Sequence, residues 1–247
     1  PGRHIETMRK CGIDLGGLER VRGRTFTWKG KYEDDMNVRK TLELKLNVFS
    51  EFKPVLPPAY RKTPCVFLGN IHPGLQEDVL NQMENPSLKA CDTIDHWIRD
   101  ERKRLLRILK KMDVFFLNDA EARVLSGERN LVKAARSVLK LGPKHVVLKK
   151  GEHGSMLVSR DGFFAVPAFP LENVCDPTGA GDSFAGGFMG YLAATGKKHE
   201  TAMRRAMVYG TVAASYCVEK FGPGRLFGLK RSDISRRARL MESYFSL

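Results

Sequence analysis

The sequence predicts an α/β fold, in which a mostly parallel β-sheet is covered by helices on both faces. Short apolar segments of strand length alternate with longer segments of helical periodicity, the pattern of repeated strand–helix units. Polar residues follow several of the apolar segments, as expected where parallel strands end at a ligand-binding edge. The 247 residues, 42% of them hydrophobic, suffice for one domain with a full core.

The main elements are expected from the periodicity of apolar residues. Strands are predicted at 65–69, 87–91, 114–117, 146–149 and 155–159, and helices at 76–82, 98–111, 121–125, 130–141, 182–195, 200–218 and 233–245. Gly142 and Pro143 end the helix that starts near Asn130. An extended stretch at 163–174 precedes the helical C-terminal third. The polar strand ends at 70–73, 92–93, 118–121, 149–154 and 176–182 are expected to line one cleft, with Asp92 and Trp97 as candidates for its substrate side.

Residues 25–49 have a different pattern from the rest of the chain. Apolar residues alternate with polar ones at period two, which is typical of strands with one face in water: Phe26, Trp28 and Tyr32, then Leu42, Leu44, Leu46 and Val48. The polar stretch 31–40 separates the two runs, and three prolines in 53–58 close the region. The pattern predicts a β-hairpin outside the main sheet, either a plain two-stranded excursion or a lid.

The most informative segment is DPTGAGDSFAGGF, from Asp176 to Phe188. It reads as a glycine-bearing turn between an extended stretch and a helix. Gly179 and Gly181 allow backbone conformations closed to other residues and leave room for a ligand. The first-turn N–H groups of the helix have no intrahelical partner, and the helix dipole adds partial positive charge there. Such a turn is suited to hold an anion, most often phosphate.

Asp182 lies within this predicted anion site. A carboxylate is a poor phosphate ligand, but it can take a proton from a hydroxyl that attacks the phosphate. The plainer interpretation is a helix start with an acidic residue in its first turn, where it suits the dipole. The flanking strand and helix, together with the second glycine pair at Gly186 and Gly187, favour the functional interpretation.

Composition and charge exclude several other classes. Five cysteines without a C-x-x-C pair suggest neither a disulfide framework nor a zinc site, and Cys65, Cys175 and Cys217 are interpreted as reduced core residues. A reducing, cytoplasmic location is therefore expected, and no apolar run is long enough to span a membrane. The net charge of +14 is spread over several helical segments without a recognised binding motif, so no specific nucleic-acid partner is expected.

The segment from Asp176 to Phe188 resembles the C-terminal signature of the PfkB (ribokinase-like) family of carbohydrate and nucleoside kinases. The resemblance implies a ribokinase-like three-layer α/β/α sandwich that forms a single domain over 1–247, with 25–49 as a β lid. It implies transfer of the γ-phosphoryl group of ATP, with Mg²⁺, to a hydroxymethyl group of a sugar or nucleoside. In this interpretation Asp182 is the general base, and the Gly179, Ala180 and Gly181 amides form an anion hole.

Two further segments resemble family motifs. Asn118 to Glu121 resembles N-x-x-E, which implies that Glu121 acts on Mg²⁺ through water and that Asn118 lies near the triphosphate. Its alternative is an ordinary capped helix start. The segment 146–154 resembles a strand and turn usually written T-L-G-x-x-G, in which Gly151 and Gly154 match and would wrap the nucleotide. Lys149 stands where Thr is common, and it either reaches a phosphate or extends to solvent.

The segment 209–222 resembles the helix and turn beside the adenine pocket, which implies nucleotide contacts for Thr211 and Gly222. Asp176 would help bind a monovalent cation such as K⁺, and its alternative role is a turn residue before Pro177. The resemblance also allows a homodimer.

The chain departs from the family at its N-terminus. The resemblance implies an opening strand whose Asp grips the acceptor, then a region with paired glycines. Residues 1–18 instead resemble the helix and turn that follow these elements, and Gly16-Gly17 is too far from a strand start to replace the pair. Sugar phosphorylation is therefore expected to be impaired while ATP and Mg²⁺ still bind. The alternative function is a catalytically impaired nucleotide- or metabolite-binding module.

Overall fold

A computed structural model of the chain describes residues 2–33, 36 and 39–244. Its central sheet has six strands in the order β3-β4-β5-β6-β7-β8. Their bounds are β3 Cys65–Leu68, β4 Leu88–Asp92, β5 Val114–Asn118, β6 His145–Lys149, β7 Ser155–Ser159 and β8 Gly162–Val166. Strands β3 to β6 run parallel, whereas β7 and β8 join by antiparallel pairing. The mostly parallel sheet predicted from the sequence is confirmed.

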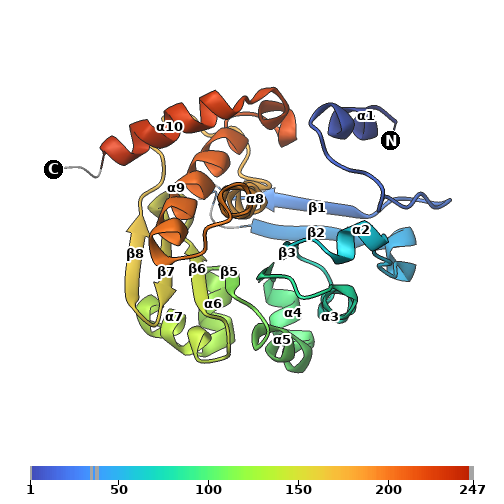
Figure 1. The fold of residues 1–247 in the computed structure, drawn as a ribbon, viewed down its shortest axis with the longest axis horizontal. Helices are drawn as coiled ribbons and strands as arrows, with labels where there is room; N and C mark the ends of the chain where they lie inside the picture. The colour runs from blue at the N-terminus through green and yellow to red at the C-terminus, as the bar shows by residue number, and fades with distance from the viewer. Residues whose placement is uncertain (1, 34–35, 37–38, 245–247) are drawn as a thin grey trace.

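Helices cover both faces of this sheet (Figure 1). One face carries α3 Pro73–Gln82, α4 Asp95–Asp100, α5 Arg102–Leu109, α6 Asp119–Ser126 and α7 Leu131–Leu139. The other face carries α8 Ala180–Thr195, α9 Glu200–Cys217 and α10 Arg231–Ser243. The chain also contains α1 Gly2–Lys10, α2 Pro58–Arg61 and the 3₁₀ helices η1 Asn47–Glu51, η2 Gly151–His153 and η3 Gly222–Gly228. The result is the expected three-layer α/β/α sandwich.

Each face of the sheet has its own buried core. Side chains alternate along a strand, so Phe116 of β5 faces α8 and α9 while Phe115 and Leu117 face the opposite helices. The Phe116 ring packs edge-on against Phe188, with ring centroids 5.2 Å apart, and against Phe184 at 6.3 Å. Phe116 and its register partners therefore define the face of the sheet that lies under α8.

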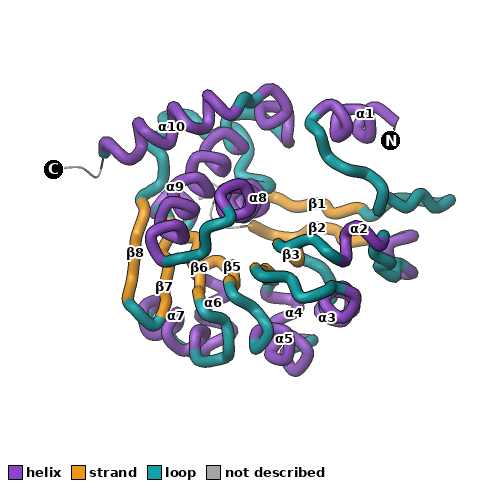
Figure 2. Tube along the Cα trace, in the orientation of Figure 1, coloured by secondary structure: helices purple, strands orange, loops and turns teal. Residues whose placement is uncertain are grey.

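The predicted hairpin is present as a separate two-stranded sheet, formed by β1 Thr27–Tyr32 and β2 Arg39–Lys45 (Figure 2). Part of the polar stretch between its strands lies outside the described residues. The Trp28 ring lies over Gly30, where an added Cβ would be 2.1 Å from the ring. Leu42 and Leu44 are 58% and 52% exposed, so the apolar face of β2 is open to solvent, whereas its alternation predicted that this face would be buried.

Three expectations were wrong in detail. The helix expected at 98–111 is interrupted at Glu101, whose backbone leaves the helical conformation, because α4 packs against α6 whereas α5 packs against α3. The extended stretch at 163–174 is a strand only as far as Val166, since Pro167 has no N–H to continue the ladder. Cys175, interpreted as a core residue, is exposed.

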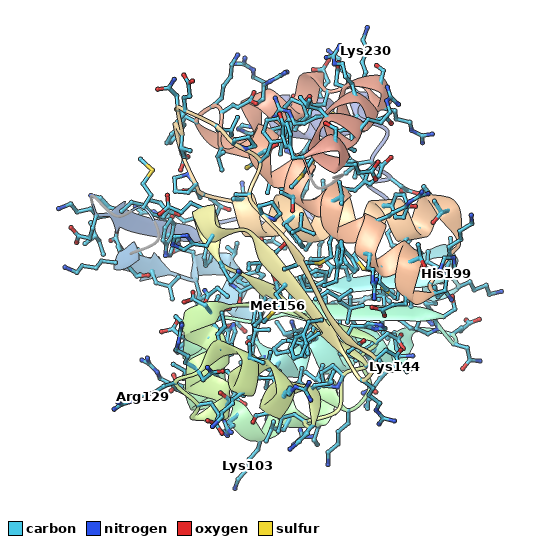
Figure 3. The ribbon with its side chains drawn as sticks, turned by 90° about the vertical axis from the view of Figure 1, so that its left-hand side faces the viewer. Lys103, Arg129, Lys144, Met156, His199 and Lys230 are labelled. Atoms are coloured by element: carbon cyan, nitrogen blue, oxygen red, sulfur yellow. The ribbon has the colours of Figure 1, made fainter. Side chains whose placement is uncertain are left out.

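Basic side chains are distributed around the molecule. In Figure 3 the labelled Lys103, Arg129, Lys144 and Lys230 project from different sides. Within the residues described, no helix is both long enough and apolar enough to cross a bilayer.

Candidate active site

Three polar residues end neighbouring parallel strands of the sheet: Asp92 on β4, Asn118 on β5 and Lys149 on β6. Asp92 is in register with Phe116, and Asn118 is in register with Lys149. Because Asn118 lies two residues beyond Phe116, all three positions belong to the face of the sheet that lies under α8. The strand ends thus bring these residues to the side from which the signature helix approaches.

The signature segment forms a tight turn into α8, as predicted. Gly179 precedes the helix with φ of 80°, a left-handed conformation that favours glycine. The Ala180 N–H donates to the Pro177 carbonyl at 3.1 Å, so it is already engaged. The N–H groups of Gly179, Gly181 and Asp182 form no hydrogen bond with any described residue. Two of the three predicted anion-hole amides, with that of Asp182, therefore remain open to a ligand.

The Asp182 side chain is exposed in the first turn of α8, beside these open N–H groups. A carboxylate there is free to approach a substrate hydroxyl, as a general base must. This exposure also agrees with the plainer interpretation, in which an acidic residue complements the helix dipole.

Lys149 reaches the same turn from the end of β6. A Cβ added to Gly181 would lie 2.9 Å from the Lys149 Nζ, so the ammonium lies against the first turn of α8. Among the residues described, the Lys149 ammonium forms no ion pair with a carboxylate. A partly buried cation without an ion pair, next to open N–H groups, is well placed to meet an anion. Of the two roles left open by the sequence, this placement favours phosphate contact.

Asn118 and Glu121 form a capping box at the start of α6. The Glu121 N–H donates to Asn118 Oδ1 at 2.8 Å, and the Asn118 N–H donates to Glu121 Oε2 at 2.7 Å. The plainer interpretation of this motif, a capped helix start, is therefore confirmed. No three His, Cys, Asp or Glu side chains converge into a metal site in the part of the chain that is described. Any Mg²⁺ would need phosphate and water ligands beside Glu121.

Asp176 connects the signature turn to the C-terminal segment. Its Oδ1 accepts the Thr178 N–H at 2.9 Å, and its Oδ2 accepts the Gly222 N–H at 3.4 Å. Burial opposes ionisation of this carboxyl, but the hydrogen bonds from Thr178 and Gly222 outweigh it and lower the pKa of Asp176. The turn role is thus established, and the same contacts bring Gly222 beside the signature.

The remaining predicted nucleotide residues are less directly placed. Gly154 must be glycine, because it has φ of 78° and an added Cβ would lie 2.1 Å from the Val166 carbonyl oxygen. Gly151 also has a positive φ, of 56°. Thr211 is buried in α9, and its hydroxyl donates to the Met207 carbonyl at 3.0 Å. These observations give each residue a structural role and do not bring it to a ligand.

Two features of the site did not follow from the sequence: a contact of Thr178 with the hairpin, and the burial of the Asp92 carboxylate. The Thr178 hydroxyl donates to the Tyr32 hydroxyl at 3.2 Å, which ties the end of β1 to the signature turn. Asp92 is only 3% exposed, and its Oδ1 has no hydrogen-bond partner among the described residues. Burial raises the pKa of Asp92 to about 7, Asp182 and Glu121 add to the rise, and the Lys149 ammonium opposes it. The position of Asp92 at a strand end was the available signal.

Comparison with known proteins gives a consistent result. Residues 3–225 match the family described as pfkB family carbohydrate kinase. A cytidine kinase from Thermococcus kodakarensis is 31% identical over 188 residues, which are 72% of this chain and 64% of the relative. The chain thus spans less than two thirds of that protein.

Solved structures share the fold. A ribokinase from Thermotoga maritima superimposes with a TM-score of 0.74 and 24% identity, over 96% of this chain and 77% of the other. A putative ribokinase II from E. coli, solved in complex with ATP and Mg²⁺, gives a TM-score of 0.77 at 17% identity, over 97% and 79% of the two chains.

Proposed function

The chain belongs to the pfkB family of carbohydrate kinases, and we propose that it transfers the γ-phosphoryl group of Mg-ATP to a hydroxymethyl group of a sugar or nucleoside. One observation carries the proposal: the exposed Asp182 carboxylate, the open N–H groups of the α8 turn and the Lys149 ammonium meet at the same helix start. A base, an anion site and a cation are the groups that phosphoryl transfer requires.

In the proposed reaction, the oxygen of the acceptor hydroxyl attacks the γ-phosphorus while Asp182 accepts the proton of that hydroxyl. The bond from that phosphorus to the bridging oxygen breaks, and ADP leaves with the electron pair. The open amides of Gly179 and Gly181 and the Lys149 ammonium stabilise negative charge on the phosphoryl oxygens. The Ala180 amide, which already donates to Pro177, contributes only if that hydrogen bond opens.

Mg²⁺ would neutralise part of the triphosphate charge when bound. The residue proposed to position it is Glu121, through water. Glu121 Oε2 already accepts the Asn118 N–H, so the capping role and the proposed metal role fall on the same carboxylate. Replacing Glu121 by Gln keeps an oxygen that can accept the capping hydrogen bond but removes the charge. We expect this variant to need more Mg²⁺ for half-maximal activity with little change in thermal stability, which would separate the two roles.

The remaining assignments are proposals of the same kind. Asn118 lies near the triphosphate, Gly151, Gly154, Thr211 and Gly222 flank the nucleotide, and Asp176 lies beside a monovalent cation such as K⁺. The hairpin formed by 25–49 acts as a lid, which the Tyr32 contact with the signature turn supports. The five cysteines are all free thiols, which supports a cytoplasmic location. A homodimer and the lack of a specific nucleic-acid partner remain predictions.

The test is Asp182→Asn, assayed for ADP release over a panel of sugars and nucleosides that includes cytidine. We expect turnover to fall at least about a hundredfold, because general-base catalysis contributes on that order or more. The ATP affinity of the variant, measured by thermal shift, should stay close to the affinity of the unsubstituted chain. Unchanged turnover would refute the role of Asp182. ATP binding without product from any acceptor, in the unsubstituted chain, would instead favour the nucleotide-binding module.

A further inference from the structure

Asp92 is a buried carboxylate that the proposed reaction does not use. It is 3% exposed, and its Oδ1 is hydrogen-bonded to no residue in the described ranges. Burying a carboxylate oxygen without a partner costs free energy, and an unsatisfied buried group calls for an explanation. Folding alone does not supply one, because an uncharged side chain at this strand end would avoid the cost.

The surroundings of Asp92 point to Lys149. Asp92 and Lys149 end β4 and β6 on the face of the sheet that lies under α8, with β5 between them. Lys149 is the cation that acts electrostatically on Asp92, while Asp182 and Glu121 are the neighbouring acidic groups that act on it. Cys91, the preceding residue, lies in the core on the opposite face of the sheet, where burial and then the nearby Asp92 carboxylate raise the pKa of its thiol. The buried Asp92 carboxylate thus lies within electrostatic reach of one cation, Lys149, while its Oδ1 has no hydrogen-bond partner among the described residues.

We propose that Asp92 is a positioning residue for Lys149, whose charge holds the ammonium toward the strand ends and keeps it from pairing with Asp182. The inference rests on the proposed function in one respect, the contact of Lys149 with phosphate. The Lys149 ammonium lies against Gly181, and the flexible four-carbon stem would otherwise let it turn to the exposed carboxylate of the next residue, Asp182, which is the proposed base. An ion pair there would occupy both the base and the cation. The ionised form of Asp92 attracts the same ammonium, and this competition leaves both Asp182 and Lys149 available.

The test is a double-mutant cycle with Asp92→Asn, Lys149→Met and the double variant. The primary measurement is the dissociation constant of Mg-ATP by calorimetry, which needs no acceptor, and kcat and KM are added where turnover is found. We expect Asp92→Asn alone to weaken ATP binding or lower kcat by about tenfold or more, because small misplacements of a positioned group have large effects. In the Lys149→Met background the same substitution should change neither quantity, since its target is absent.

Two further variants test the role of charge. Asp92→Glu keeps the charge and should retain most of the ATP affinity, whereas Asp92→Ala should behave like Asp92→Asn. An Asp92→Asn effect that is equally large with and without Lys149 would overturn the inference, because it would show a structural role. Wild-type behaviour of Asp92→Asn would also overturn it.

The same cycle distinguishes this inference from the proposed function. If Lys149→Met alone leaves ATP binding and turnover unchanged, the assignment of Lys149 to phosphate is wrong, and the role of Asp92 falls with it. If Lys149→Met weakens ATP binding but Asp92→Asn does not, only the inference about Asp92 fails.

Discussion

The buried Asp92 carboxylate should destabilise the fold at alkaline pH, and Asp92→Asn should remove that effect. The pKa of this carboxyl is 3.8 in the unfolded chain and about 7 in the folded protein. An acid with a raised folded pKa contributes stability that is fully present below 3.8 and is lost as the pH rises through about 7. This shift of roughly three pKa units means that Asp92 lowers the free energy of unfolding by about 4 kcal/mol at about pH 8, and by about 2 kcal/mol at about pH 5.

The assay is denaturant unfolding of the wild-type chain and Asp92→Asn at both pH values, without nucleotide or Mg²⁺. We expect the stability advantage of the variant to grow by about 2 kcal/mol from the acidic to the alkaline condition. Comparing two pH values cancels any pH-independent effect of the substitution, such as a new hydrogen bond of the amide. An advantage that stays constant with pH would refute the reasoning. Confirmation would mean that Asp92 lowers stability at a position where it is proposed to serve function.

Other predictions concern packing and contacts near the site. Gly187→Ala should destabilise α8 by about 1–3 kcal/mol in denaturant unfolding, because its Cβ would lie 2.6 Å from the Tyr209 carbonyl oxygen. Gly186→Ala is the matched control, has nothing within 4 Å, and should be neutral or stabilise by up to about 1 kcal/mol; equal losses would contradict the packing argument. Tyr32→Phe removes the lid contact and should lower kcat/KM for the acceptor by about two- to tenfold, whereas an unchanged value would show that the contact does not matter. Thr211→Val should raise KM for ATP severalfold with a small change in thermal midpoint; an unchanged KM would remove Thr211 from the nucleotide site.

Much of the fold could be predicted because local sequence determines it. The strand from Val114 is an uninterrupted apolar run, and its buried position between two parallel neighbours follows from that pattern. The break at Glu101 could not be predicted, because α4 and α5 separate only to pack against different helices. The hairpin alternation was recognised, yet the exposure of Leu42 and Leu44 depends on what lies opposite β2, which periodicity does not encode.

The candidate site shows the same division. The signature turn was predicted, with conformational freedom expected at both Gly179 and Gly181: Gly179 is left-handed, whereas Gly181 is helical and has no positive φ. Gly187 was interpreted as part of that signature, but its close neighbour is the Tyr209 carbonyl of α9, so it serves the contact between two helices. The approach of Lys149 to Gly181 and the isolation of Asp92 arise from residues far apart in sequence. Their positions were identified, but their relation required the tertiary structure.

The hydrogen bond between Tyr32 and Thr178 joins residues 146 positions apart in the chain. Because the contact joins such distant residues, we expect it to form late in folding, after the six-stranded sheet has brought the signature turn into place. The chain entropy lost on closing a loop grows only slowly with loop length, and assembly of the sheet already restricts most of the chain between these two residues. One hydroxyl pair can therefore hold the hairpin at little additional cost. Because so few contacts hold the hairpin, we expect it to open locally at a free energy well below that of global unfolding.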